Sequence, residues 1–109
     1  MSKDKGRAVN RIYISGPITS IGVSRAREVF YATRDDLKRR GFDAVTPFEN
    51  GVDEAAPYED HMKADIELLK TCDTICLLPG WWHSEGAKRE KAVAESIGMT
   101  VITYRKLKR

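Results

Sequence analysis

A glutamate lies among apolar residues in the segment SEGAKREKAVAESIG, which spans residues 84–98. On a helical wheel the apolar positions that share one face are Ala87, Val93, Ala94 and Ile97. A globular protein buries such a face. Glu90 falls inside it, three residues after Ala87 and four before Ala94. A carboxylate directed at a core must find a partner or shift its pKa, so we consider Glu90 a candidate catalytic residue.

A second carboxylate borders the apolar face of a predicted helix over residues 58–71. Asp65 falls beside the apolar positions of that helix, which are Met62, Ile66 and Leu69. Two such acids on helices that flank one strand predict an acid pair at a cleft. The structural alternative has Asp65 capping a loop and Glu90 pairing with an arginine across an interface. Tyr13, on a predicted strand, either hydrogen-bonds such a carboxylate or is a half-buried core aromatic.

The start of the 84–97 helix offers a different kind of site. Ser84 is a predicted N-cap, and Gly86 in the first turn lets a ligand approach the backbone closely. The free N–H groups and the positive end of the helix dipole favour phosphate or another anion there. The preceding Trp81 and Trp82 either provide a surface on which a base stacks or serve as lid or interface residues.

Strands and helices alternate in the sequence around these residues. The predicted strands span 11–15, 42–46, 74–79 and 100–104, and the predicted helices span 23–40, 58–71 and 84–97. Residues 48–57 show no periodicity and are predicted to be a loop. This alternation predicts one three-layer Rossmann-like (flavodoxin-like) α/β domain. Its mainly parallel sheet should have four to five strands, with the core order 2-1-3-4.

The predicted sheet places the ligand site at the carboxyl ends of its strands. The loops that follow the first three strands should converge there. Gly16 lies in the first of them, within SGPITS, and is therefore a candidate for contact with a substrate. The loop has neither the G-x-G-x-x-G nor the Walker pattern, which argues against a kinase or a dinucleotide-dependent dehydrogenase.

Composition limits the classes of function. The 109 residues are 41% hydrophobic and 32% charged, enough for one domain with a modest core. No apolar stretch approaches the roughly 20 residues of a membrane helix, and the N-terminus has no apolar signal region. The two cysteines, Cys72 and Cys76, favour a reducing cytoplasm over a disulfide framework. With His61 and His83 they are too few to predict a zinc site.

The net charge of +3 is concentrated at the two ends of the chain. Basic side chains outnumber acidic ones in residues 1–11 and 105–109, so the part between them is acidic. We predict a flexible basic tail over 1–10, the domain over 11–104 and a second basic tail over 105–109. A domain without a basic excess argues against specific recognition of nucleic acid.

Three segments of the sequence resemble a known family. They are IYISGPIT, YEDHMKADIELLKTCDTICLLPGW and SEGAKREKAVAESIGM. Together they resemble the nucleoside 2-deoxyribosyltransferase-like superfamily, most closely its small, often phage- or prophage-associated DUF4406-type branch. The resemblance covers residues 12–104. It implies cleavage of an N-glycosidic bond, or deoxyribosyl transfer, on a nucleoside or nucleotide.

The resemblance also implies a role for each candidate residue. Glu90, which ends the G-x-x-x-E segment Gly86-Ala-Lys-Arg-Glu90, matches the nucleophile, and Asp65 matches the acid that assists at the base or sugar. Tyr13 matches the tyrosine that steadies the nucleophile, and Ser84 matches a serine that binds the 5′-phosphate. A carboxylate beneath C1′ can stabilise oxocarbenium-like charge and then bond to that carbon, so no metal or organic cofactor is needed.

Two further hypotheses stay open from the sequence. The chain is either a nucleotide-binding protein without catalysis, or a small structural partner whose acids serve an oligomer interface. Association into a homodimer or a larger homo-oligomer is expected from the resemblance. The tryptophans at 81 and 82 and the aromatic residues of the first helix favour it as well.

Overall fold

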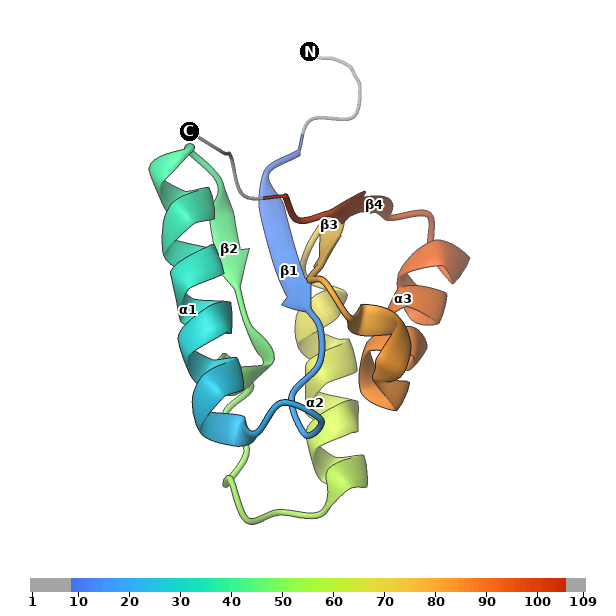
Figure 1. The fold of residues 1–109 in the computed structure, drawn as a ribbon. Helices are drawn as coiled ribbons and strands as arrows, with labels where there is room; N and C mark the ends of the chain where they lie inside the picture. The colour runs from blue at the N-terminus through green and yellow to red at the C-terminus, as the bar shows by residue number, and fades with distance from the viewer. Residues whose placement is uncertain (1–8, 106–109) are drawn as a thin grey trace.

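Four short strands pair in parallel to form the sheet of the protein (Figure 1). A computed structural model describes residues 9–105. The strands are β1 (Arg11–Ser15), β2 (Asp43–Val45), β3 (Thr74–Leu77) and β4 (Thr100–Thr103). Their order is β2-β1-β3-β4, which confirms the predicted core order. Most of both predicted basic tails lies outside the described residues.

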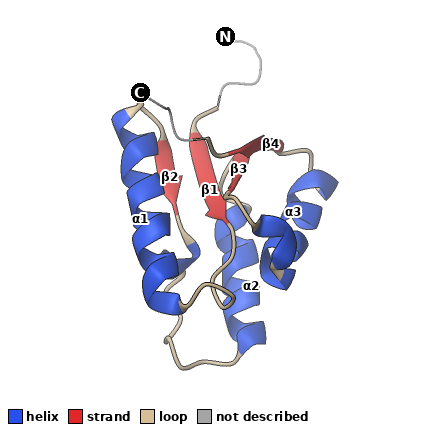
Figure 2. Cartoon of the chain, in the orientation of Figure 1, coloured by secondary structure: helices blue, strands red, loops and turns tan. Residues whose placement is uncertain are grey.

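Among the described residues, three α-helices flank this sheet; helices are blue in Figure 2. They are α1 (Val23–Arg39), α2 (Tyr58–Leu69) and α3 (Glu85–Ser96). Two short 3-10 helices are also present: η1 (Pro47–Glu49) follows β2, and η2 (Trp81–His83) precedes α3. α1 lies on one side of the sheet, and α2 and α3 lie on the other (Figure 1). The α/β Rossmann-like architecture is therefore the predicted one.

The side chains of β1 alternate between the two helical layers, as the period of a strand requires. Ile12 and Ile14 pack in the cluster that contains Phe30 of α1. Tyr13 packs in the opposite cluster, with Leu69 of α2 and Ala94 of α3. Because the side-chain period of a strand is two, the hydroxyls of Tyr13 and Ser15 both point toward α2 and α3.

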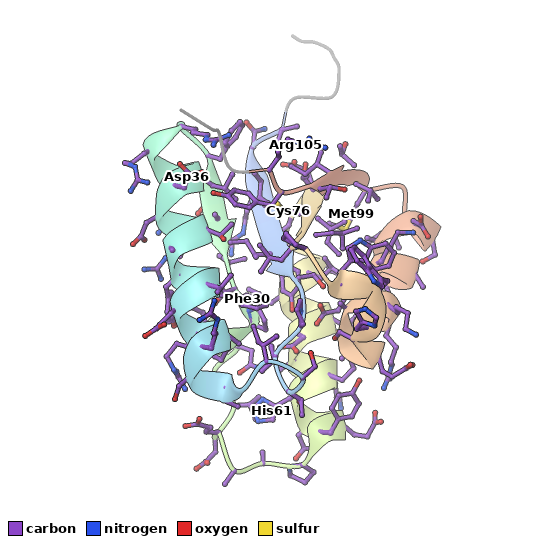
Figure 3. All side chains as sticks on the ribbon, viewed as in Figure 1. Phe30, Asp36, His61, Cys76, Met99 and Arg105 are labelled. Atoms are coloured by element: carbon purple, nitrogen blue, oxygen red, sulfur yellow. The ribbon has the colours of Figure 1, made fainter. Side chains whose placement is uncertain are left out.

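The first helix buries the face that the sequence predicts. Its buried residues are Ala26, Phe30, Thr33 and Leu37. Figure 3 shows Phe30 between α1 and the sheet. The centroids of the Phe30 and Phe48 rings lie 5.4 Å apart in an edge-to-face arrangement. Gly41 follows the helix with a φ of 97°, a backbone conformation that favours glycine and so confirms it as the predicted stop signal.

Two local predictions were wrong. Ile97 is not in the core: α3 ends at Ser96, and the Ile97 side chain beyond it is 50% exposed. Residues 48–57 are not wholly irregular, because η1 extends to Glu49. Thr46 Oγ accepts a hydrogen bond from Phe48 N–H (3.1 Å), and the Glu49 carboxylate accepts one from Thr46 N–H (2.8 Å). The T-x-x-E spacing of this capping box is present in the sequence.

The state of the cysteines and the lengths of the helices concern two classes considered from the sequence, disulfide-bonded proteins and membrane-spanning proteins. Cys72 and Cys76 are both buried free thiols. Burial raises the pKa of Cys76 to about 12, which keeps it protonated and unreactive. None of the helices between residues 9 and 105 combines the length and apolar character that a membrane span requires.

Candidate active site

Glu90 lies on the buried side of α3, with only 4% of its surface exposed. Each of its carboxylate oxygens accepts a hydrogen bond from a hydroxyl of β1. Ser15 Oγ donates to Oε1 at 2.6 Å, and Tyr13 Oη donates to Oε2 at 2.9 Å. The partners are therefore strand hydroxyls rather than an arginine. The two bonds orient the carboxyl group at the end of β1.

Asp65 brings a second carboxyl group to Glu90 from α2. It is 7% exposed, and its Oδ1 accepts a hydrogen bond of 2.7 Å from Asn50 Nδ2. Both acids line the same cleft, and each alters the pKa of the other. The acid pair predicted from the two helical faces is thus formed in the structure.

Burial dominates the electrostatics of this pair. It raises the pKa of Glu90 to about 8; the Ser15 hydrogen bond opposes the shift, and the charge of Asp65 adds to it. Burial also raises the pKa of Asp65, and the hydrogen bond from Asn50 offsets only part of this rise. The pKa of Tyr13 is raised well above its usual value by burial and then by the negative charge of Glu90. Tyr13 therefore stays a protonated donor at neutral pH.

The acid pair forms part of the wall of a cleft of about 650 Å³. The loop after β1 contributes Gly16, Ile18, Thr19 and Ser20. The segment after β2 contributes Pro47, Phe48, Asn50, Val52 and Glu54, and the start of α3 contributes Glu85, Gly86 and Ala87. These segments follow β1, β2 and β3, as expected for a parallel sheet that binds its ligand at the carboxyl ends of the strands.

The helix start and both candidate glycines lie on this cleft. Ser84 Oγ accepts a hydrogen bond from Ala87 N–H at 3.1 Å, which confirms Ser84 as the N-cap of α3. A Cβ at Gly16 would lie 2.7 Å from Leu78 Cβ, and one at Gly86 would lie 3.3 Å from Met62 Cε. A side chain at Gly16 would therefore clash with Leu78, whereas at Gly86 the flexible end of Met62 would have to move by a few tenths of an ångström.

Trp81 is the candidate that the structure does not bring to the others. It is half-buried and packs against the core cluster on the α2 and α3 side of the sheet. Lys91 Nζ lies 5.3 Å from the centre of its ring. His83, from the same short helix, lines the cleft instead.

Three residues of the site were missed in the sequence: Ser15, Asn50 and His61. Ser15 had a usable signal, because it follows Tyr13 by two residues on a strand and must share its face. Neither Asn50 nor His61 had such a signal in the sequence. Their side chains meet at 3.2 Å only because the chain between η1 and α2 folds back toward α2. Figure 3 shows His61 near this loop, at the opposite end of the fold from Asp36.

The chemistry available here is that of carboxyl groups and hydroxyls. Between residues 9 and 105, no cluster of three or more His, Cys, Asp or Glu side chains could hold a metal ion. Two acids with different surroundings can take different protonation states, one ionised and one neutral. A carboxylate and a proton donor are the groups that glycosidic-bond cleavage uses.

Comparison with known proteins finds a family and a structural neighbour. Residues 10–103 match the family described as "Domain of unknown function (DUF4406)". Among solved structures, the fold is similar to that of a 2-desoxiribosyltransferase from Leishmania mexicana, with a TM-score of 0.67 and 20% sequence identity. The similarity covers 92% of this chain and 67% of that one. No curated protein sequence matches. The chain therefore belongs to the DUF4406 family and has the fold of a deoxyribosyltransferase.

Proposed function

We propose that this protein cleaves the N-glycosidic bond of a nucleoside or nucleotide, or transfers its deoxyribosyl group, with Glu90 as the nucleophile. The observation that carries the proposal is the buried acid pair. Glu90 has both oxygens oriented by hydroxyls and lies beside Asp65 on the wall of a cleft. The likeness of the fold to a 2-desoxiribosyltransferase agrees with a nucleoside as the substrate.

The proposed reaction has two displacements at C1′ of the sugar. An oxygen of Glu90 bonds to C1′ as the bond from C1′ to the base nitrogen breaks. Asp65 donates its proton to the departing base. Water or a second base then attacks C1′ and gives its proton to the ionised Asp65 as the bond from C1′ to Glu90 breaks, which releases the free sugar or a new nucleoside. Tyr13 and Ser15 hold the carboxylate in line throughout.

The proposed substrate lies along the cleft from the start of α3 to the segment after β2. Ser84 and the backbone N–H groups near Gly86 would bind an anionic 5′ end. Gly16 would bring the first loop close to the sugar. Stacking of the base on Trp81 stays a prediction, and the position of its ring outside the cleft lining does not support it.

The proposal is tested by a screen for free base. Deoxynucleosides and their 5′-monophosphates are incubated with the protein, and released base is separated and measured by chromatography. We expect release from at least one of these substrates, with water or a second base as the acceptor. Binding of a nucleotide without release of base from any of them would contradict the catalytic proposal.

A second candidate function is nucleotide binding without catalysis. The burial of Glu90 favours it, because burial raises the pKa of this side chain to about 8 and so leaves most of it protonated at neutral pH in the free protein. An uncharged carboxyl group is a poor nucleophile. Calorimetry with the same nucleotides, run beside the screen, separates the two functions.

Replacement of Ser84 by alanine should weaken binding of a 5′-monophosphate by roughly tenfold, the value of a hydrogen bond to a charged group. Binding of the corresponding nucleoside should change much less. The variant should also lose about 1 kcal/mol of stability, because Ser84 Oγ caps α3. Titration calorimetry with both ligands measures the difference.

Ser96→Ala is the matched control for this prediction, because Ser96 lies at the other end of α3 and bonds Val93 O. It should leave both affinities unchanged. Equal losses for nucleoside and monophosphate in Ser84→Ala would mean that Ser84 acts only as a cap.

Association into a homodimer or larger assembly is proposed as well. The large apolar side chains left exposed include Trp82, Ile97 and Val101, at 54%, 50% and 36%. An interface that covered them would remove apolar surface from water. Light scattering on the full chain measures the assembly.

A further inference from the structure

Asn50 lies between the acid pair and the loop that follows η1, and its side chain has only one possible orientation. Val52 N–H, which can only donate, points at one end of the amide from 2.9 Å. That end must therefore be the oxygen of Asn50. The NH₂ group is left at the other end, where it faces α2.

The NH₂ group of Asn50 has two partners on α2. It donates to Asp65 Oδ1 at 2.7 Å and lies 3.2 Å from His61 Nδ1. The other ring nitrogen of His61, Nε2, lies 3.3 Å from the backbone oxygen of Glu54, which can only accept. Nε2 therefore carries the hydrogen, and Nδ1 is free to accept from Asn50. The donor and the acceptor of each of these hydrogen bonds are therefore fixed, and Asp65 is one of the acceptors.

The two acids consequently have different kinds of partner. Asn50 can only donate to Asp65 through NH₂, and such a donor favours an ionised carboxylate. Glu90 is held by the hydroxyls of Ser15 and Tyr13. A hydroxyl can donate or accept, so it accommodates a protonated carboxyl as well as a carboxylate. Glu90 is also the more deeply buried of the two acids, so when the pair holds one proton, burial favours its location on Glu90 and the Asn50 donor favours the charge on Asp65.

We propose that Asn50 is a positioning residue that holds Asp65 ionised in the free protein and keeps the shared proton on Glu90. The proposed reaction needs the opposite arrangement, with Glu90 ionised and Asp65 protonated, so this inference rests on the proposed function. When substrate binds, the proton leaves Glu90 and passes to Asp65, which leaves Glu90 as the carboxylate. Asp65 then gives the same proton to the departing base. The unreactive form is thus the resting form.

Two of the other groups that face the pair oppose this arrangement, because the hydrogen bonds from Ser15 and Tyr13 lower the pKa of Glu90, whereas the rest lie farther along the cleft. Tyr13 and Ser15 of β1 hydrogen-bond only Glu90. His61 of α2 lowers the pKa of Asp65 only when its ring is charged, and after burial Asn50 has the largest effect on that pKa. The remaining titratable residues of the cleft are Arg27, Glu54, Tyr58, His83 and Glu85.

Carboxyl-carbon NMR of the full chain, labelled at Asp and Glu and titrated without substrate, tests the assignment. In the wild-type protein Asp65 should lose its proton well before Glu90 as the pH rises. Asn50→Leu keeps much of the volume and removes the donor. It should move the titration of Asp65 upward by about one to two pH units, the value of one hydrogen bond to a charged group.

Asn50→Ala is the second variant, in case leucine disturbs the loop, and should give a shift in the same direction. Asn10→Ala is the matched control, because Asn10 lies before β1 and makes its contacts to Asp73 through its backbone N–H. It should leave the titration of Asp65 unchanged. An Asp65 that titrates at the same pH in the wild type and both Asn50 variants would overturn the proposal.

The pH dependence of kcat/KM adds a functional measurement once a substrate is known. Loss of Asn50 should move the acidic limb of the profile toward higher pH. A higher KM with an unmoved limb would mean that Asn50 contacts the substrate, and would overturn the positioning role. Absence of turnover on any nucleoside would count against the proposed function, whereas the NMR titration decides on Asn50 without any substrate.

Discussion

Glutamine in place of Glu90 should reduce the release of free base by about 10⁴-fold, the loss typical when a catalytic carboxylate is disabled. The substitution keeps the size of the side chain and removes its ability to form a bond to C1′. The hydroxyls of Ser15 and Tyr13 can still bond the amide, because each can donate or accept. The fold should therefore be intact, and the loss should fall on kcat. Steady-state kinetics on the substrate found in the screen measures it.

Glu95→Gln is the matched control, since it makes the same change on the exposed side of the same helix. Glu95 pairs with Lys91 across one turn of α3, where Nζ lies 2.7 Å from Oε2. Its replacement should leave turnover within about twofold of wild type, because an exposed pair of this kind contributes little. A Glu90→Gln protein that is less stable but still active would make Glu90 a structural residue and reject the nucleophile.

The same Glu90→Gln substitution should stabilise the protein by an amount that grows with pH. The pKa of Glu90 is about 8 in the folded protein, against 4.5 for the unperturbed side chain. Between these pH values the folded state binds more protons than the unfolded state, so wild-type stability falls as the pH rises. Glutamine has no proton to lose. We expect a gain on the order of 5 kcal/mol above pH 8, and little gain below pH 4.5.

Denaturant unfolding of wild type and variant at pH 5, 7 and 9 measures this gain. The two stability curves should diverge as the pH rises and then run parallel above pH 8. Glu95→Gln again serves as the control and should follow the wild type throughout. Parallel curves for Glu90→Gln and wild type from pH 5 to 9 would show that burial does not perturb Glu90, and would contradict the assigned pKa.

Opposite effects on stability and turnover are the signature expected of a functional carboxylate. Burial makes the charged form of Glu90 costly, and a fold without need of that charge gains from its removal. A structural carboxylate makes the reverse prediction, because its partners are left unsatisfied when it goes. The two measurements on one variant therefore separate the roles without reference to any relative.

The sequence by itself determined the architecture and the identity of the central acid. Strand and helix periodicity arise from contacts between near neighbours in the chain, so the buried face of α1 could be read from spacing alone. Glu90 was recognisable because it breaks the apolar pattern of α3. Asp65 was recognisable in the same way on α2. These are local patterns, and local geometry is sufficient to interpret them.

Only the tertiary structure decided which side chains hold the pair. Ser15 and Glu90 are 75 residues apart, and Asn50 reaches Asp65 from an irregular segment with no repeating pattern. The protonation of Glu90 is likewise set by how completely β1, α2 and α3 exclude water from it. Burial and hydrogen-bond direction depend on the whole packed arrangement, so no spacing within one segment encodes them.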